Sequence, residues 1–180
     1  PLVTDALRGE DPDLWEMALR LVREVPGASA TTVFAGLAPE LPSARKALLL
    51  GALADRGDTG ARAAVLEAAK DPDEEVQAAA LAALAPLGDA STVALLAETA
   101  ASGQGKAREA AVNSLARLRG ADIDRALISG MQSASGELKA AHIQALAARQ
   151  AMEAVPALLT VAQNGDETAR IEALRALSSL

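Results

Sequence analysis

The most constraining feature of the sequence is an apolar pattern that recurs every 31 residues along the chain. One position is held by Leu19, Leu50, Leu81, Val112, Ile143 and Leu174. The position three residues later is held by Val22, Leu53, Leu84, Leu115, Leu146 and Leu177. The residue before the first position is Ala18, Leu49, Ala80, Ala111, His142 or Ala173. A further set marks a second helix: Val3, Phe34, Val65, Leu96, Leu127 and Leu158. A constant interval of this size predicts two-helix units that stack on their neighbours.

The clearest unit runs from Asp71 to Ala100. Its first helix carries apolar residues with helical period, and these predict one buried stripe: Val76, Ala80, Leu81, Leu84 and Leu87. Asp71 is the expected N-cap, with Pro72 at the first helical position. In other units the pattern predicts a cap at Asp11, a helix end at Gly57, Pro156 in a first turn, and Gly130 as a weak point that costs roughly 1 kcal/mol relative to Ala.

Residues 71–89 read Asp-Pro-x-x-x-Val-Gln-x-x-Ala-Leu-x-x-Leu-x-x-Leu-Gly-Asp. This motif resembles the short HEAT-like repeat of phycobilisome-lyase-type and many bacterial proteins, and the pattern extends over essentially the whole chain. The resemblance implies an all-α fold, a right-handed α-solenoid (α-α superhelix) of about five to six helix-pair repeats. It implies little about activity, because such repeats are scaffolds in unrelated proteins.

The repeat pattern predicts a single HEAT-like domain over residues 1–180. Its units are expected at 1–10 (partial), 11–40, 41–70, 71–102, 103–134, 135–165 and 166–180 (partial). Because the first and last units each lack one helix, we expect the sequence to be a piece of a longer protein. Apolar helices left without neighbours are then expected to self-associate through the two ends.

Composition and charge exclude several classes of function. The chain is 51% hydrophobic but 1% aromatic, so its core must be built from Ala, Leu and Val. The formal net charge of −7 disfavours nucleic acid and anionic membranes as partners. There is no Cys, which excludes disulfides and thiolate metal sites in this sequence. No apolar stretch approaches the roughly 18 residues of a membrane-spanning helix.

No catalytic centre is predicted. His142 is the only histidine, so neither a His-His metal pair nor a Ser-His triad can form within the chain. The acidic cluster at 71–75 has ligands that suit a hard cation or acid-base chemistry, but acidic residues also favour helix N-termini. Residues 103–106 lack the spacing of a phosphate-binding loop. We therefore expect no catalytic residues, no metal ligands, no cofactor and no enzymatic activity.

One column of the repeat is mostly cationic, and it consists of Trp15, Lys46, Gln77, Arg108, Lys139 and Arg170. In HEAT families a basic residue near this place is structural and pairs with an acid in a neighbouring turn. The partners expected here are Asp58, Asp89, Glu137 and Asp166. The alternative is a cationic row for a phosphate backbone, which would need several phosphate contacts and usually aromatic platforms. The negative net charge and the single Trp favour the structural interpretation.

Solenoids of this kind use the concave surface formed by their second helices. The candidate binding residues on that face are Glu67, Lys70, Glu98, Arg125, Ser129, Gln132, Thr160 and Gln163. A mixed, shallow face suits an extended peptide or a partner's helix better than a small molecule. The predicted function is therefore a non-catalytic protein-protein interaction and scaffolding module. Two alternatives stay open: an accessory function of the lyase type, and DNA binding as in HEAT-like alkylpurine DNA glycosylases.

Overall fold

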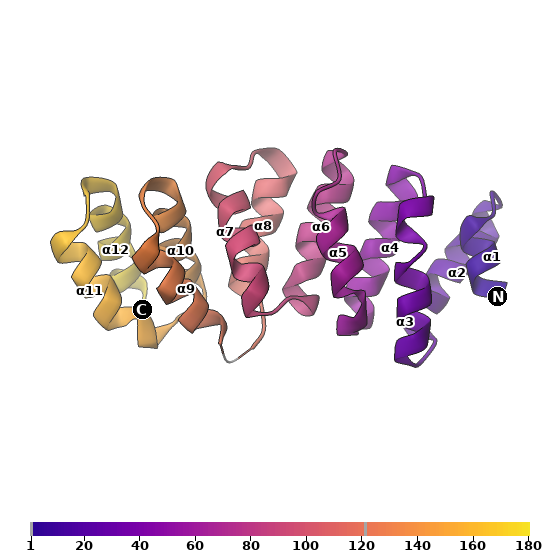
Figure 1. Ribbon diagram of the computed structural model, residues 1–180, viewed down its shortest axis with the longest axis horizontal. Coiled ribbons are helices and arrows are strands. Elements are labelled where there is room, and N and C mark those ends of the chain that lie inside the picture. Colours follow the sequence, from indigo (N-terminus) through magenta and orange to yellow (C-terminus); the bar gives the residue numbers. More distant parts are fainter. Residues whose placement is uncertain (1, 121) are drawn as a thin grey trace. The chain divides into compact units, whose positions relative to one another are not determined.

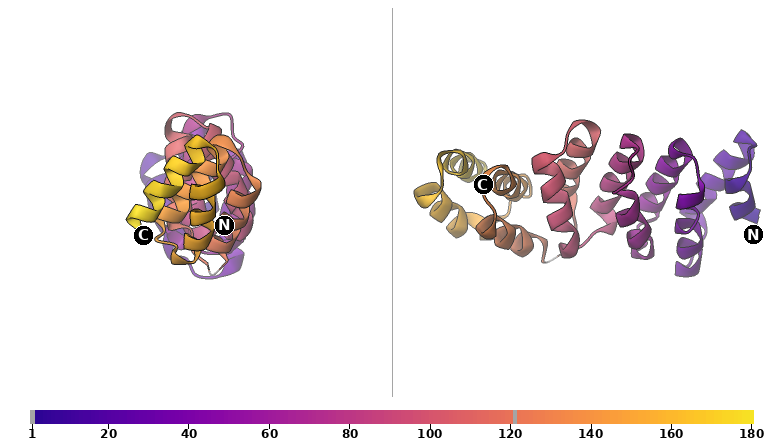
Figure 2. Two further views of the ribbon diagram at one scale, coloured as in Figure 1. Left: turned by 90° about the vertical axis from the view of Figure 1, so that its left-hand side faces the viewer. Right: turned by 45° about the horizontal axis from the view of Figure 1, so that its top comes forward.

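The computed structural model describes residues 2–120 and 122–180, which form α-helices joined by short turns and include no strand. The chain divides into two compact units, residues 1–88 and residues 89–180. Each unit consists of successive helix hairpins (Figure 1 and Figure 2). None of the described helices has both the length and the apolar character needed to cross a bilayer. The fold is all-α and of the repeat-solenoid class, as the 31-residue period predicts.

The first unit contains α1 (Leu2–Arg8), α2 (Pro12–Glu24), α3 (Ala28–Ala35), α4 (Ser43–Arg56), α5 (Arg62–Ala68) and α6 (Glu74–Leu87), with 3-10 turns at Ala38–Glu40 and Thr59–Ala61. The first helices of successive repeats pack in series, α2 on α4 and α4 on α6. Val22, Leu53 and Leu84 are completely buried in this core.

The second unit contains α7 (Val93–Ser102), α8 (Gly105–Arg117), α9 (Ile123–Ser133), α10 (Gly136–Ala148), α11 (Val155–Asn164) and α12 (Glu167–Ser179), with 3-10 turns at Ala90–Thr92 and Met152–Ala154. Helix α10 is central, because it packs against α7, α8, α9 and α12. Leu96, Leu127 and Leu158 of the second helices are completely buried.

The predicted core register is confirmed at most positions and wrong at two. Val112 in α8 and Leu174 in α12 are 43% and 57% exposed. In both helices the buried face is a narrow stripe, formed in α8 by Ala107, Ala111, Ser114 and Leu115, and in α12 by Ala169, Ala173 and Ala176. Each of the two exposed residues follows an alanine of that stripe, which places it about 100° away around the helix.

Several predicted helix ends are confirmed. Asp11 is the N-cap of α2, and its carboxylate accepts the N–H groups of Asp13 and Leu14 at 3.0 and 3.1 Å. Gly57 ends α4 in the left-handed region with φ of 70°. Pro156 lies in the first turn of α11, where its missing N–H costs nothing.

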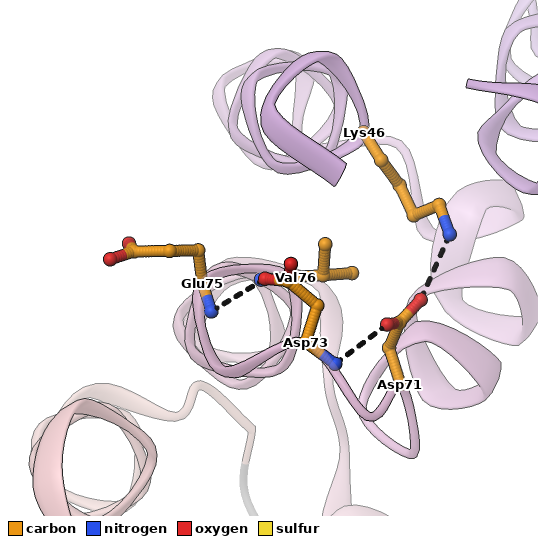
Figure 3. Close-up of polar contacts among 5 residues, drawn as sticks. All are labelled: Lys46, Asp71, Asp73, Glu75 and Val76. Carbon is orange, nitrogen blue, oxygen red and sulfur yellow. Dashed lines mark hydrogen bonds and ion pairs between the residues drawn. The ribbon is translucent and has the colours of Figure 1, made fainter. Parts of the chain in front are cut away.

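The prediction that Asp71 caps the sixth helix is wrong. Helix α6 begins at Glu74, and its N-cap is Asp73, whose carboxylate accepts the N–H groups of Glu75 and Val76 at 3.0 and 3.2 Å (Figure 3). Asp71 accepts the N–H of Asp73 at 3.0 Å and so belongs to the turn before the helix. Pro72 therefore precedes α6 and does not open it.

Candidate binding surface

The predicted binding residues are all exposed, and all but Lys70 belong to second helices. In the first unit Glu67 lies on α5 and Lys70 lies in the turn that follows it. In the second unit they lie on three helices: Glu98 on α7, Arg125, Ser129 and Gln132 on α9, and Thr160 and Gln163 on α11. The second unit therefore carries most of the candidate surface.

The exposed cations of this surface have partners close to them in sequence. The Lys70 ammonium pairs with Glu67 at 2.9 Å, and the Arg125 guanidinium pairs with Asp122 at 2.8 Å. Exposed pairs of this kind contribute about 0–1 kcal/mol to stability. They do, however, neutralise the charge of the face. In contrast, the side chains of Ser129, Gln132 and Gln163 have no hydrogen bond to any described residue.

A pocket of about 240 Å³ opens beside these polar residues in the second unit. Its lining comes from α9, α10, α11 and the turn that follows: Gln132, Lys139, Ala157, Thr160, Val161, Asn164 and Gly165. Lys139 is partly buried, and its ammonium has neither a hydrogen bond nor an ion pair with any residue that the structure describes. Gln132 and Thr160 therefore belong both to the predicted surface and to the pocket.

An equivalent pocket of about 300 Å³ lies in the first unit. Each residue that lines the pocket of the second unit has a counterpart three repeats, or 93 residues, earlier in the lining of this pocket: Pro39, Lys46, Ala64, Glu67, Ala68, Asp71 and Pro72. Here Lys46 donates to the Asp71 carboxylate at 2.9 Å, and the two side chains are only 17% and 16% exposed (Figure 3). The hydrogen bond from Lys46, followed by that from the Asp73 N–H, holds the pKa of Asp71 below its ordinary value.

The acidic partners predicted for the cationic column are wrong. Arg108 and Arg170 donate to the carbonyls of Ala100 and Ala162 at 3.0 and 3.3 Å, eight residues earlier. Gln77 makes the same bond to Ala69 at 3.2 Å. These side chains satisfy carbonyls near the end of the preceding second helix, which have no partner within that helix.

Three of the four predicted acids are engaged elsewhere, and Glu137 pairs with none of these cations among the described residues. Asp89 and Asp166 accept backbone N–H groups at the start of the helical turns that follow them, and Asp58 accepts both the Thr31 hydroxyl at 2.6 Å and the Gly60 N–H at 2.9 Å. Within the part of the chain that the structure describes, Lys46 is the one cation of this column that pairs with an acid, and that acid is Asp71. The column is therefore structural, as expected, but it works mainly through backbone carbonyls.

The described residues include no cluster of three or more His, Asp or Glu side chains arranged to hold a metal ion. His142 is buried, and its Nδ1 lies 2.7 Å from the carbonyl of Leu138. Its ring also rests against Gly130 of α9, so closely that a Cβ built there would lie 2.2 Å from Nε2. The interpretation of His142 as a helix-packing residue is confirmed. Because Gly130 has no side chain, it leaves the space that the His142 ring occupies. The sequence alone did not indicate this role of Gly130.

The stacked helix hairpins define the class of protein, a helical repeat protein. Comparison then identifies the repeat: residues 31–116 match the family described as HEAT repeats. The match covers just under half of the chain, and together with the helix hairpins it supports a HEAT-like repeat. A search of curated proteins gave no match.

Solved structures agree with this fold. An engineered protein with 22% sequence identity superposes with a TM-score of 0.53 over 98% of this chain and 94% of that one. A designed armadillo repeat protein with 16% identity superposes with a TM-score of 0.50 over the whole of both chains. At these identities the likeness establishes the fold class alone.

Proposed function

We propose that this chain is a non-catalytic interaction module whose second unit binds an extended peptide, or a helix of a partner protein, along the exposed face of α7, α9 and α11. The observation that carries the proposal is a set of exposed polar side chains without a partner among the described residues, Ser129, Gln132 and Gln163, next to an open pocket. Hydroxyl and amide groups both donate and accept hydrogen bonds, so they can match the alternating N–H and C=O groups of a peptide backbone.

The charge of the face supports a peptide over a nucleic acid. Arg125 is already paired with Asp122, and Glu98 adds a negative charge. Phosphate binding depends on several uncompensated cations, and single-stranded nucleic acid also needs aromatic side chains for stacking. The eight candidate residues include no aromatic residue.

The test is a selection of displayed random peptides on the full chain, followed by fluorescence polarisation with the recovered peptides. Ser129→Arg places a long charged side chain on the proposed face and is expected to weaken binding about tenfold or more, a loss of about 1.4 kcal/mol. Asn113→Arg is the matched control, because Asn113 is exposed on the first helix α8. Equal affinity of the two variants, or failure to recover any binding peptide, would contradict the proposal.

A further inference from the structure

We propose that the pocket between α9, α10 and α11 binds an acidic side chain, Asp or Glu, of the partner peptide, with Lys139 as the cation that recognises it. This inference rests on the proposed function and specifies the chemistry of the partner. It follows from a comparison of the two pockets that lie three repeats apart.

Lys139 is the first part of the argument. It is partly buried and lacks a partner among the described residues, whereas the other cations of its column each have one: Lys46 has Asp71, and Arg108 and Arg170 have backbone carbonyls. A carboxylate from outside the chain would supply the missing pair.

The first unit shows where such a carboxylate fits. Asp71 lies against Lys46 at 2.9 Å in the equivalent pocket, so that pocket already contains its own anion. The counterpart of Asp71 in the second unit is Asn164, which is neutral and exposed. The second pocket therefore retains the lysine and lacks the acid, and a ligand carboxylate beside Lys139 would repeat the pairing that the first unit makes internally.

The surroundings of Lys139 suit a carboxylate. The amides of Gln132 and Asn164 line the pocket and can donate hydrogen bonds, while the Thr160 hydroxyl donates to the carbonyl of Pro156 at 3.0 Å. The neighbouring acid Asp166 is engaged as the N-cap of α12, where it accepts the Ala169 N–H at 2.9 Å. A volume of about 240 Å³ admits a carboxylate side chain, since a water molecule takes about 30 Å³ in the liquid.

One substitution tests the inference directly. Asn164→Asp places a carboxylate where the first unit has Asp71, so it should pair with Lys139 and close the pocket to acidic ligands. Asn113→Asp is the matched control, because it makes the same change of charge at an exposed position on α8. Lys139→Gln removes the cation itself, and Arg117→Gln is its control, because it removes an exposed cation on α8, outside the proposed surface.

The binding assay uses selected peptides and their Glu→Gln or Asp→Asn forms. Neutralising the acid should weaken binding about tenfold or more to the wild-type chain, Asn113→Asp and Arg117→Gln, and have little effect on binding to Lys139→Gln and Asn164→Asp. If peptides bind but neutralising their acids costs the same in every variant, the proposed function stands and the acidic specificity is overturned. If no peptide binds, the proposed function itself fails.

A second measurement tests the pocket without any peptide. Sodium acetate, titrated into isotopically labelled full chain, should produce saturable NMR shift changes at Gln132, Lys139 and Asn164, and acetamide should not. Asn164→Asp should abolish these changes and Asn113→Asp should preserve them. Equal responses to acetate and acetamide, or an acetate response that survives Asn164→Asp, would overturn the inference.

Discussion

The repeat formed by α4 and α5 and the repeat formed by α10 and α11 lie three repeats apart in the sequence, and they differ mainly in their polar groups. The shared positions include Leu53 and Leu146, Lys46 and Lys139, and Arg56 and Arg149. The differing positions include Asp71 against Asn164, Gly57 against Gln150, and Leu49 against His142. Most of the apolar packing repeats, although the buried Leu49 is replaced by the buried His142. The acidic partner of Lys46 has no counterpart beside Lys139. This difference leaves Lys139 available to a ligand.

The two arginines, both partly buried, have equivalent backbone partners. Arg56 donates to the carbonyls of Val22 and Val25, and Arg149 donates to those of Leu115 and Leu118, their counterparts three repeats later. These carbonyls end the preceding first helix and would otherwise lack partners.

The anions beside the two arginines occupy different positions. Arg56 Nε donates to the Thr31 hydroxyl at 2.5 Å, and Thr31 donates in turn to Asp58. Arg149 Nε bonds directly to Asp124, the counterpart of Thr31. The first unit thus places a hydroxyl between the guanidinium and its carboxylate, and the second unit makes the ion pair directly.

The largest expected effect tests whether the cores of the two repeats are packed in the same way. Leu53→Ala and Leu146→Ala should each lower the free energy of unfolding by about 2–5 kcal/mol, because both side chains are completely buried. Leu48→Ala on the exposed side of α4 is the control and should change stability by about 0.5 kcal/mol or less. Urea unfolding of the full chain measures all three, and a negligible loss at either buried leucine would show that the two repeats do not pack alike.

The second prediction separates the two arginine arrangements. Arg149→Met and Arg56→Met should each cost about 2–3 kcal/mol, since each removes charge-assisted hydrogen bonds to partly buried groups. Adding Asp124→Asn to Arg149→Met should recover part of the loss, because the partly buried carboxylate is no longer left without its cation. Adding Thr31→Val to Arg56→Met should recover nothing. Recovery of stability in both backgrounds, or in neither, would contradict the inference that Arg149 pairs directly with a carboxylate and Arg56 does so through a hydroxyl.

The apolar core was predictable from the sequence because translation by one repeat preserves packing. Phe34, Val65 and Leu127, for example, are all buried as their shared column requires. Polar partners were not predictable, because they depend on side-chain reach and on the offset between neighbouring helices. Lys46 on α4 bonds to Asp71 in the turn after the following helix, α5, whereas Arg108 on α8 bonds to a carbonyl of the preceding helix, α7.

The candidate surface was predictable only in part. The helical pattern placed its residues on exposed faces, but the pocket became visible only in the structure. The substitution of Asp71 by Asn164 three repeats later was the sequence signal that could have indicated it.

The third prediction concerns one helical glycine in each of the two units. Gly51 in α4 has open space around it, so Gly51→Ala should stabilise the chain by about 0.5–1 kcal/mol. Gly130→Ala should have the opposite sign and cost about 1–3 kcal/mol, because its Cβ would collide with the buried His142 ring. Adding His142→Ala should relieve the collision, so that Gly130→Ala no longer destabilises that background. Thermal unfolding monitored by circular dichroism distinguishes these outcomes.

The fourth prediction follows from the Asp71 carboxylate. Its pKa in the folded chain is lowered from the ordinary 3.8, chiefly by the hydrogen bond from Lys46. A lowered carboxyl pKa contributes stability that is present above the ordinary value and lost as the pH falls through the folded value. Urea midpoints should therefore fall less between neutral pH and about pH 3 for Asp71→Asn than for the wild type. Asn164→Asp should increase the loss, and identical pH profiles for all three chains would contradict this account.

The smallest expected effect concerns the residue that ends the first helix of each repeat. Gly57 adopts a φ of 70° without strain, whereas its counterpart Gln150 adopts a φ of 56°, which is unfavourable for a residue with a side chain. Gln150→Gly should therefore stabilise the second unit, although it also removes side-chain hydrogen bonds to the carbonyls of Ala147 and Ser179.

We expect the net gain to be about 0.5 kcal/mol, less than the cost usually assigned to a left-handed residue, because the two lost bonds offset part of it. Gln150→Ala is the matched control: it loses the same bonds and keeps the unfavourable φ, so it should destabilise the chain. Hydrogen exchange at the amides of α10 and α12 would place the effect within the second unit. A glycine variant no more stable than the alanine variant would mean that the backbone at Gln150 stores no strain. The positive φ would then cost no more stability at Gln150 than at Gly57.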